Sequence, residues 1–269
     1  MRYLKLAQGL TGLVGTIFPV YSLGLYLRVP AVRQLWVWPE SPALGLAFVG
    51  SWLAGLAAPL IWIGLAGHLP ALRGGALAGV VAYGGSAFLL WVRHSLPGKE
   101  RFLPFAVVCV LIALFAVIVL IWSARLSTPD DRRSPPVIRW TFLLFSAILL
   151  PVGLGMVMGN SRIFPAELLP DMTRLYGWFF LGSFVYYFFG FLKPSWLNST
   201  GHMLSFLVYD LLLIPPFAQY WQVVPADFRW NLFMYLMVLV ASMFFCIFFL
   251  FMNPRTRLFR TASSFSANV

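Results

Sequence analysis

Charged side chains are scarce in this sequence, and their scarcity excludes a water-soluble globular protein. Only 10% of the 269 residues are charged, whereas 61% are hydrophobic. A typical soluble domain carries about 25% charged residues, which make its polar surface. The apolar residues also come in long blocks, without the alternating or 3.6-residue stripes of a fold that faces water. The composition therefore predicts an integral membrane protein.

Recognisable catalytic and metal-binding motifs are also missing. The sequence has no H-E-x-x-H, no G-x-S-x-G, no P-loop and no G-x-G-x-x-G before a helix. Its two cysteines, Cys109 and Cys246, lie in apolar segments without a C-x-x-C pair, where cysteine usually behaves as a small hydrophobic residue. These features favour a protein that is not an enzyme, and they assign no cofactor.

Only three histidines are present, and two of them are candidate ligands. His68 ends the second apolar block and His202 begins the seventh, so an eight-span topology places both on one side of the membrane. Two imidazoles are the minimum for a haem with two histidine ligands. A haem or metal site at His68 and His202 is one hypothesis, and ordinary interfacial histidines beside turn residues are the alternative.

Eight apolar blocks are long enough to cross a bilayer, because a hydrocarbon core about 30 Å thick needs about 20 apolar helical residues. The sequence predicts an all-α, polytopic helical bundle with spans at 4–27, 42–67, 75–92, 102–124, 140–158, 174–192, 203–219 and 231–252. These spans form one transmembrane domain over 1–252. We expect a flexible, basic and Ser-rich cytoplasmic tail over 253–269.

Lysine and arginine set the predicted orientation. With eight spans, eleven of the 19 basic residues lie on the side of both termini and eight on the other. Because loops rich in Lys and Arg stay in the cytoplasm, we expect both termini there, in a prokaryotic cytoplasmic membrane. The basic residues lie beside spans and not on one folded surface, so the lipid bilayer is the expected partner and nucleic acid is not.

The two halves of the chain differ in composition. Fifteen of the 22 glycines lie in residues 1–125, and twenty of the 26 phenylalanines lie after them. This difference argues against a recent duplication but leaves an old repeat of four helices plus four open. Small residues spaced by four predict close helix contacts. They are Gly50, Ala54 and Ala58, then Gly75 and Gly79, then Gly155 and Gly159.

The Phe-rich half, 139–252, has two interpretations. Its aromatic residues can face lipid and neighbouring helices, with an interfacial belt of tryptophans. Alternatively they can line a groove for an apolar ligand such as a quinone, a carotenoid or an acyl chain. The belt tryptophans are Trp178, Trp196, Trp221 and Trp230.

Acidic residues outside the spans suggest no site. Asp130 and Asp131 precede Arg132 and Arg133, which indicates a solvated and self-compensating charge cluster. Glu167 and Asp171 lie four residues apart, with Pro170 between them. We expect these two to cap the start of the sixth span.

Asp210 is the most informative residue, because it lies inside the apolar segment HMLSFLVYDLLLIPPFAQYW. A carboxyl group there costs several kcal/mol unless it is protonated, paired or facing water. Two prolines follow it, and each lacks the N–H that its helix needs, which frees two carbonyls one turn below. The alternative is a structural aspartate bonded to a neighbouring helix. The candidate ligand or ion site comprises Asp210, Tyr209, Ser205, Leu211, Leu212, Pro215 and Pro216.

Three functions fit these features. The first is a multi-pass protein that binds or moves a small solute, a proton or a lipid within the bilayer. The second is an accessory or assembly subunit of a larger membrane complex, which needs no site of its own. The third is an intramembrane enzyme acting on lipid or isoprenoid substrates, for which the clustered acids or histidines are lacking.

Overall fold

Eight apolar helices, each long enough to cross a membrane, make up the described bundle, as the sequence predicts for an all-α polytopic membrane protein. The computed structural model describes residues 2–127 and 132–258. The spanning helices are α1 (Arg2–Tyr26), α3 (Ala43–Ala66), α4 (Leu72–His94), α5 (Phe102–Ser123), α6 (Pro136–Val157), α7 (Pro170–Leu192), α8 (Trp196–Tyr220) and α9 (Ala226–Ile247). Short elements join or extend them: helix α2 (Pro30–Gln34), the 3-10 turn η1 (Leu69–Ala71) and the π-helical turn η2 (Phe248–Met252).

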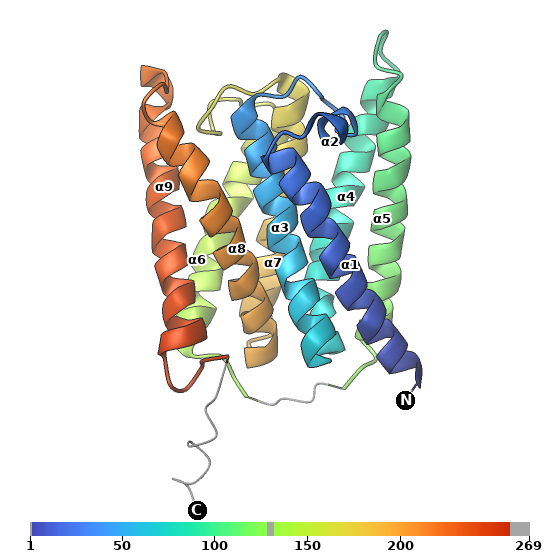
Figure 1. Ribbon diagram of the computed structural model, residues 1–269, viewed down its shortest axis with the longest axis vertical. Helices are drawn as coiled ribbons and strands as arrows, with labels where there is room; N and C mark the ends of the chain where they lie inside the picture. The colour runs from blue at the N-terminus through green and yellow to red at the C-terminus, as the bar shows by residue number, and fades with distance from the viewer. Residues whose placement is uncertain (1, 128–131, 259–269) are drawn as a thin grey trace, which may run out of the picture.

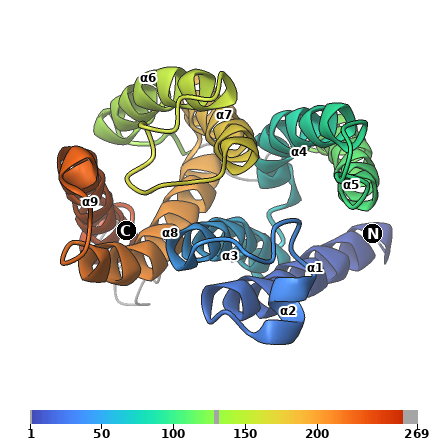
Figure 2. The same ribbon diagram turned by 90° about the horizontal axis from the view of Figure 1, so that it is seen from above.

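The helices form two layers of four. One layer runs α1, α3, α8, α9, and the other runs α5, α4, α7, α6, with close packing between neighbours in each row (Figure 2). We call them layer A and layer B. Within a row the neighbours are antiparallel, and all eight helices run along the long axis of the molecule (Figure 1). The layers face each other across a seam, where α3 and α8 lie opposite α4 and α7.

The packing order repeats after four spanning helices. Moving four spans along the chain turns the α1–α3 contact into α6–α7, and the α4–α5 contact into α8–α9. The same shift turns the α3–α8 contact of layer A into the α7–α4 contact of layer B. Each layer therefore contains one hairpin pair from each half of the chain. This is the contact pattern of a four-plus-four internal repeat in which corresponding helices run in the same direction.

Within layer A, glycines let the α1 and α3 backbones approach closely. A Cβ atom at Gly64 would lie 2.5 Å from the Cα of Gly12, and one at Gly50 would lie 2.8 Å from the carbonyl oxygen of Ser22. The carbonyl oxygen of Gly50 in turn accepts a 2.6 Å hydrogen bond from the Ser22 hydroxyl. The prediction of a close contact at Gly50 is confirmed, since no larger side chain fits there.

Two other predicted small-residue contacts hold only in part: a Cβ at Gly79 would lie 3.4 Å from the Cβ of Ala116 on α5, and one at Gly155 would lie 2.4 Å from Cδ1 of Ile163, before α7. A Cβ at Gly75 would meet no atom within 4 Å, because this residue faces open space. Gly159 lies beyond the end of α6 and has a φ of +92°, so it ends the helix and does not pack within it. The close α6–α7 approach uses Gly177, where a Cβ would lie 2.5 Å from the backbone nitrogen of Val157.

The tryptophan belt is only partly present. Trp221 and Trp230 are exposed near one end of the bundle, where an interfacial residue belongs. Trp196 is buried at the start of α8, and the Trp178 ring packs directly against Gly85 of α4. These two tryptophans pack inside the bundle. Gly85 of α4 leaves room for the Trp178 ring, and Trp196 is enclosed where α8 begins.

The beginning of α1 and the end of η2 lie at the same end of the bundle, together with the end of α5 and the start of α6 (Figure 1). Residues 132–135 precede α6. They pair with the α7–α8 turn: Ser134 donates to the Pro194 carbonyl and Trp196 donates to that of Arg132. Asp130 and Asp131 lie outside the described residues. The first part of the predicted tail is folded, since Thr256 donates a 2.7 Å hydrogen bond to the Phe249 carbonyl.

We expect Gly64→Ala to destabilise the bundle, because its methyl group would collide with the backbone of Gly12. The expected loss is about 1–3 kcal/mol, the usual cost of overpacking a close contact. Gly9→Ala is the matched control on α1, since a Cβ there meets nothing within 4 Å. Unfolding of the purified protein in mixed detergent micelles measures both variants. Equal stability of the two would contradict the close α1–α3 approach.

Candidate functional site

A cavity of about 1340 Å³ lies in the seam between layers A and B. Its lining comes from all eight spanning helices and from residues 160–165 before α7. Apolar side chains make most of this lining. We call this space the seam cavity.

The margins of the seam cavity are apolar and exposed. Leu10 of α1 and Phe115 of α5 both line it, and they are 52% and 62% exposed. On the opposite flank, Ile148 of α6 and Met234 of α9 line it and are 42% and 46% exposed. In a membrane-spanning bundle, side chains at these positions face acyl chains. The seam cavity therefore borders the hydrocarbon of the bilayer on both flanks.

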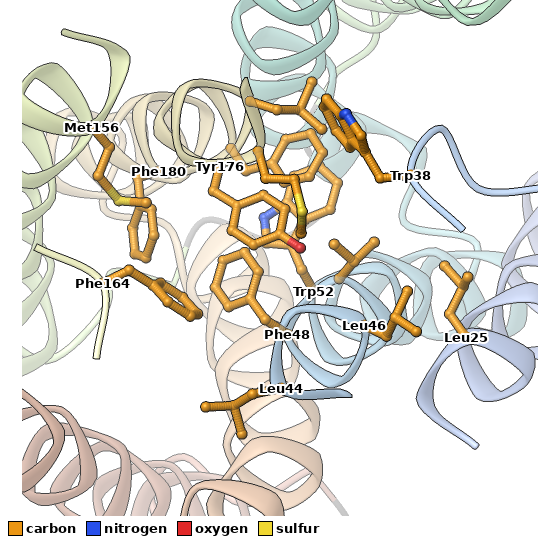
Figure 3. Close-up of a cluster of buried hydrophobic side chains, with 14 of the residues drawn as sticks. Leu25, Trp38, Leu44, Leu46, Phe48, Trp52, Met156, Phe164, Tyr176 and Phe180 are labelled. Atoms are coloured by element: carbon orange, nitrogen blue, oxygen red, sulfur yellow. The ribbon is translucent and has the colours of Figure 1, made fainter. Parts of the chain in front are cut away.

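Aromatic rings occupy the middle of the seam, where α3 and α7 face each other. Phe48 and Trp52 of α3 point toward Tyr176 and Phe180 of α7 (Figure 3). Trp52 stacks on Phe179 with ring centroids 4.2 Å apart, and Phe48 lies 4.7 Å from Tyr176. The Tyr176 hydroxyl donates a 2.9 Å hydrogen bond to the carbonyl of Gly45, which ties α7 to α3. The two layers are thus joined by rings at the centre of the seam.

Asp210 is fully buried in α8 and is one of the residues that line the seam cavity. Its Oδ2 atom accepts a 2.5 Å hydrogen bond from the Ser242 hydroxyl of α9. Its Oδ1 atom is buried and has no hydrogen-bond partner among the described residues. Half of the carboxyl group is therefore satisfied by a neighbouring helix, and the other half is not.

Tyr209 and Tyr235 form a second polar link between α8 and α9. Their hydroxyl oxygens are 2.5 Å apart, and both residues line the seam cavity. Ser205, one turn before Tyr209, also lines it. The backbone of Ser205 approaches α3, since a Cβ at Gly55 would lie 3.1 Å from its carbonyl oxygen. Three polar residues of the cavity lining, Ser205, Tyr209 and Asp210, thus lie close together on α8.

The remaining residues of the predicted site do not reach this face. Leu211 and Pro215 are exposed on the outer surface of α8, and neither they nor Leu212 and Pro216 belong to the cavity lining. A helix turns by about 100° per residue, so Leu211 and Pro215 share the face opposite the buried one. Helix α8 continues through both prolines to Tyr220. The described geometry brings together Asp210, Tyr209 and Ser205 in the cavity lining, whereas Leu211, Leu212, Pro215 and Pro216 lie outside it.

Sequence reasoning missed Ser242 and Tyr235. Ser242 lies 32 residues after Asp210, in the apolar stretch of α9 that follows Tyr235. A lone hydroxyl in such a stretch is a weak signal by itself. Only the α8–α9 packing shows which carboxyl group it faces.

The two candidate haem ligands have different surroundings. Both ring nitrogens of His202 face backbone carbonyls, with Nδ1 2.5 Å from that of Asn198 and Nε2 2.7 Å from that of Tyr186. The ring also stacks on Tyr186 with centroids 3.8 Å apart. His68 lies at the end of α3, with its ring 5.4 Å from that of Trp62. In this arrangement His202 presents no nitrogen to an iron atom and links α7 to α8.

Charged groups gather at the end of the bundle opposite the termini. The capping prediction is wrong for Asp171: Leu169 is the N-cap of α7 and no described side chain caps this helix, and the Asp171 carboxylate pairs instead with Arg93 at 3.0 Å. Arg174 and Lys99 lie 3.6 and 3.8 Å from the same carboxylate. Glu167 is exposed outside the helix. This cluster joins α4, the α4–α5 loop and α7. Asp210 takes no part in it and has no ion pair in the described part of the chain.

No protein-family model, curated protein or solved structure matches this chain.

A double-mutant cycle will show whether the Tyr209–Tyr235 bond stabilises the α8–α9 contact. We expect Tyr209→Phe and Tyr235→Phe each to lower the free energy of unfolding by about 0.5–1.5 kcal/mol, with a clearly smaller loss for the second change once the first is made. Tyr220→Phe on α8 is the control, and its effect should add to that of Tyr235→Phe. Additive effects of Tyr209→Phe and Tyr235→Phe would mean that the two hydroxyls do not interact.

Proposed function

We propose that this multi-pass membrane protein binds a lipid-like molecule in the seam cavity and exchanges it sideways with the bilayer. The observation that carries the proposal is the apolar lining of a 1340 Å³ cavity whose margins are exposed apolar side chains. Ligand sites of about 300–1000 Å³ hold drug-sized molecules, so this volume suits a larger, chain-like ligand. The molecule would move between the two layers without crossing a polar surface.

The apolar lining favours a lipid-like molecule over the ion or polar solute that the sequence leaves open. A path for an ion or a polar solute needs water or a row of polar groups along its whole length. In the described residues the polar groups of the seam cavity are few, and several of them lie on α8 and α9 around Asp210. A long apolar molecule matches this distribution, because its tail meets carbon along most of the cavity.

An accessory or assembly subunit is the second candidate function. Helices α1 and α5 favour it, because only 11% of the residues in an apolar 18-residue stretch of each helix are buried within the bundle. Two such faces are compatible with lipid contact and with docking of other membrane subunits. Copurification from the native membrane separates the two functions. Stable protein partners on α1 and α5, with no bound lipid, would favour the subunit.

Filling the seam cavity should displace the bound molecule. Gly75→Phe places a ring in the cavity lining, at a position where a Cβ meets nothing within 4 Å. Gly84→Phe is the matched control on α4, since its Cβ also meets nothing within 4 Å and the residue does not line the cavity. Organic extraction and mass spectrometry of the purified proteins measure the lipid retained per chain. We expect less retained lipid for Gly75→Phe alone. Equal retention in both variants would contradict binding in the seam cavity.

We further propose that both chain ends face the cytoplasm, which the balance of Lys and Arg supports. Ser127 and Ser95 are exposed serines at opposite ends of the bundle, after α5 and after α4. In a variant without Cys109 and Cys246, an impermeant thiol reagent outside intact cells should label Ser95→Cys and not Ser127→Cys. Labelling of Ser127→Cys alone would reverse the orientation.

A further inference from the structure

Asp210 offers an acceptor that no described group uses. Oδ1 is buried and unpartnered, whereas Oδ2 bonds to Ser242 at 2.5 Å. The Ser242 hydroxyl also lies 3.1 Å from the carbonyl of Leu239, one turn back on α9. A serine has a single hydroxyl hydrogen, so it donates fully to only one of these two oxygens.

The ionised form of Asp210 and the neutral form protonated on Oδ2 leave the same need for a donor at Oδ1. In the ionised form, Ser242 donates to Oδ2 and Oδ1 keeps unpaired acceptor sites. In the neutral form, the carboxyl proton on Oδ2 can bond to Ser242, whose own hydrogen then bonds to the Leu239 carbonyl. Oδ1 is then a carbonyl oxygen that again lacks a donor. An unmade hydrogen bond at a buried acceptor costs about 1–3 kcal/mol, so a donor placed there is stabilising.

The bilayer makes this acceptor decisive for selectivity. An apolar chain gains little by moving from acyl chains into an apolar cavity, because both surroundings are hydrocarbon-like. A hydrogen-bonding head group behaves differently, since it finds no partner in the bilayer core and finds one at Asp210. Asp210 is also the only acidic residue in the interior of a described spanning helix; Asp171 and Asp227 lie in first helical turns.

We propose that the Oδ1 atom of Asp210 binds the hydrogen-bond-donating head group of a long-chain amphiphile whose tail lies in the seam cavity. The inference rests on the proposed lipid-binding function and names the ligand class. Two head groups share the required chemistry, namely a hydroxyl and an amine. Ser242 orients the carboxyl group from α9, and Tyr209 and Tyr235 line the cavity beside it.

The test compares the binding of three radiolabelled probes to the full-length protein in lipid nanodiscs. The probes share one alkyl chain and differ in the head group: hexadecanol, hexadecylamine and hexadecane. The wild-type protein should bind at least one of the two donor probes about tenfold more tightly than hexadecane, which corresponds to one hydrogen bond at a buried acceptor.

Asp210→Leu should abolish that preference. Asp210→Asn separates the head groups, because an amide oxygen still accepts from a hydroxyl but no longer attracts an ammonium group. Asp227→Asn, an exposed aspartate at the start of α9, is the control and should bind as the wild type does.

A measurement on the unmodified protein covers the case in which Asp210→Leu does not fold. Dicyclohexylcarbodiimide is an apolar reagent that modifies carboxyl groups within the bilayer, and peptide mass spectrometry locates the adduct. The favoured donor probe should slow modification of Asp210, and hexadecane should not. Equal modification with and without the donor probes would overturn the assignment.

The outcomes separate the two proposals. Equal binding of all three probes, or a preference that survives in Asp210→Leu, overturns the role of Asp210 and leaves lipid binding in the seam cavity intact. Binding of no probe overturns both.

Discussion

Close backbone approach within each layer is the constraint on which the rest of the structure depends. Gly12 and Gly64 bring α1 against α3, and Gly177 brings α7 against the end of α6. Helices in a membrane gain no hydrophobic free energy from association, so close van der Waals contact of this kind holds each row together. The bulky residues are consequently left for the seam. Rings such as Trp52 and Phe179 meet there, and large rings at the centre leave room on both flanks.

The seam cavity combines two properties that rarely occur together. It is apolar along most of its length, and it contains a carboxyl group that is only half satisfied. In water-soluble proteins an apolar pocket draws ligands by excluding water. Within a bilayer that force is absent, and discrimination between ligands passes to the few polar atoms. The half-satisfied carboxyl group and the hydroxyl groups of Ser242, Tyr209 and Tyr235 lie on α8 and α9, so the second half of the chain differs from the first in chemistry although it repeats its packing order.

The sequence predicted the spans well, because twenty consecutive apolar residues have few alternatives to a transmembrane helix. It also identified Asp210 as an interior residue, since a carboxyl group in such a segment is costly when exposed to lipid. The sequence alone did not identify the partners of Asp210. Ser242 meets it only through the register between α8 and α9, which no local pattern encodes. The prolines do remove backbone donors, but the side chains of Leu211 and Pro215 are exposed whereas that of Asp210 is buried, so these residues share no surface of the cavity.

The distribution of the layers along the chain bears on the order of assembly in the membrane. Layer B consists of α4 to α7, which are consecutive, so it can close as soon as these helices have been inserted. Layer A needs α8 and α9 beside α3, and these helices leave the ribosome after α4 to α7. Until then, the flank of α3 that receives Ser205 and Tyr209 stays uncovered. The wall that carries Asp210 is consequently added during biosynthesis after layer B, when that layer is already in place.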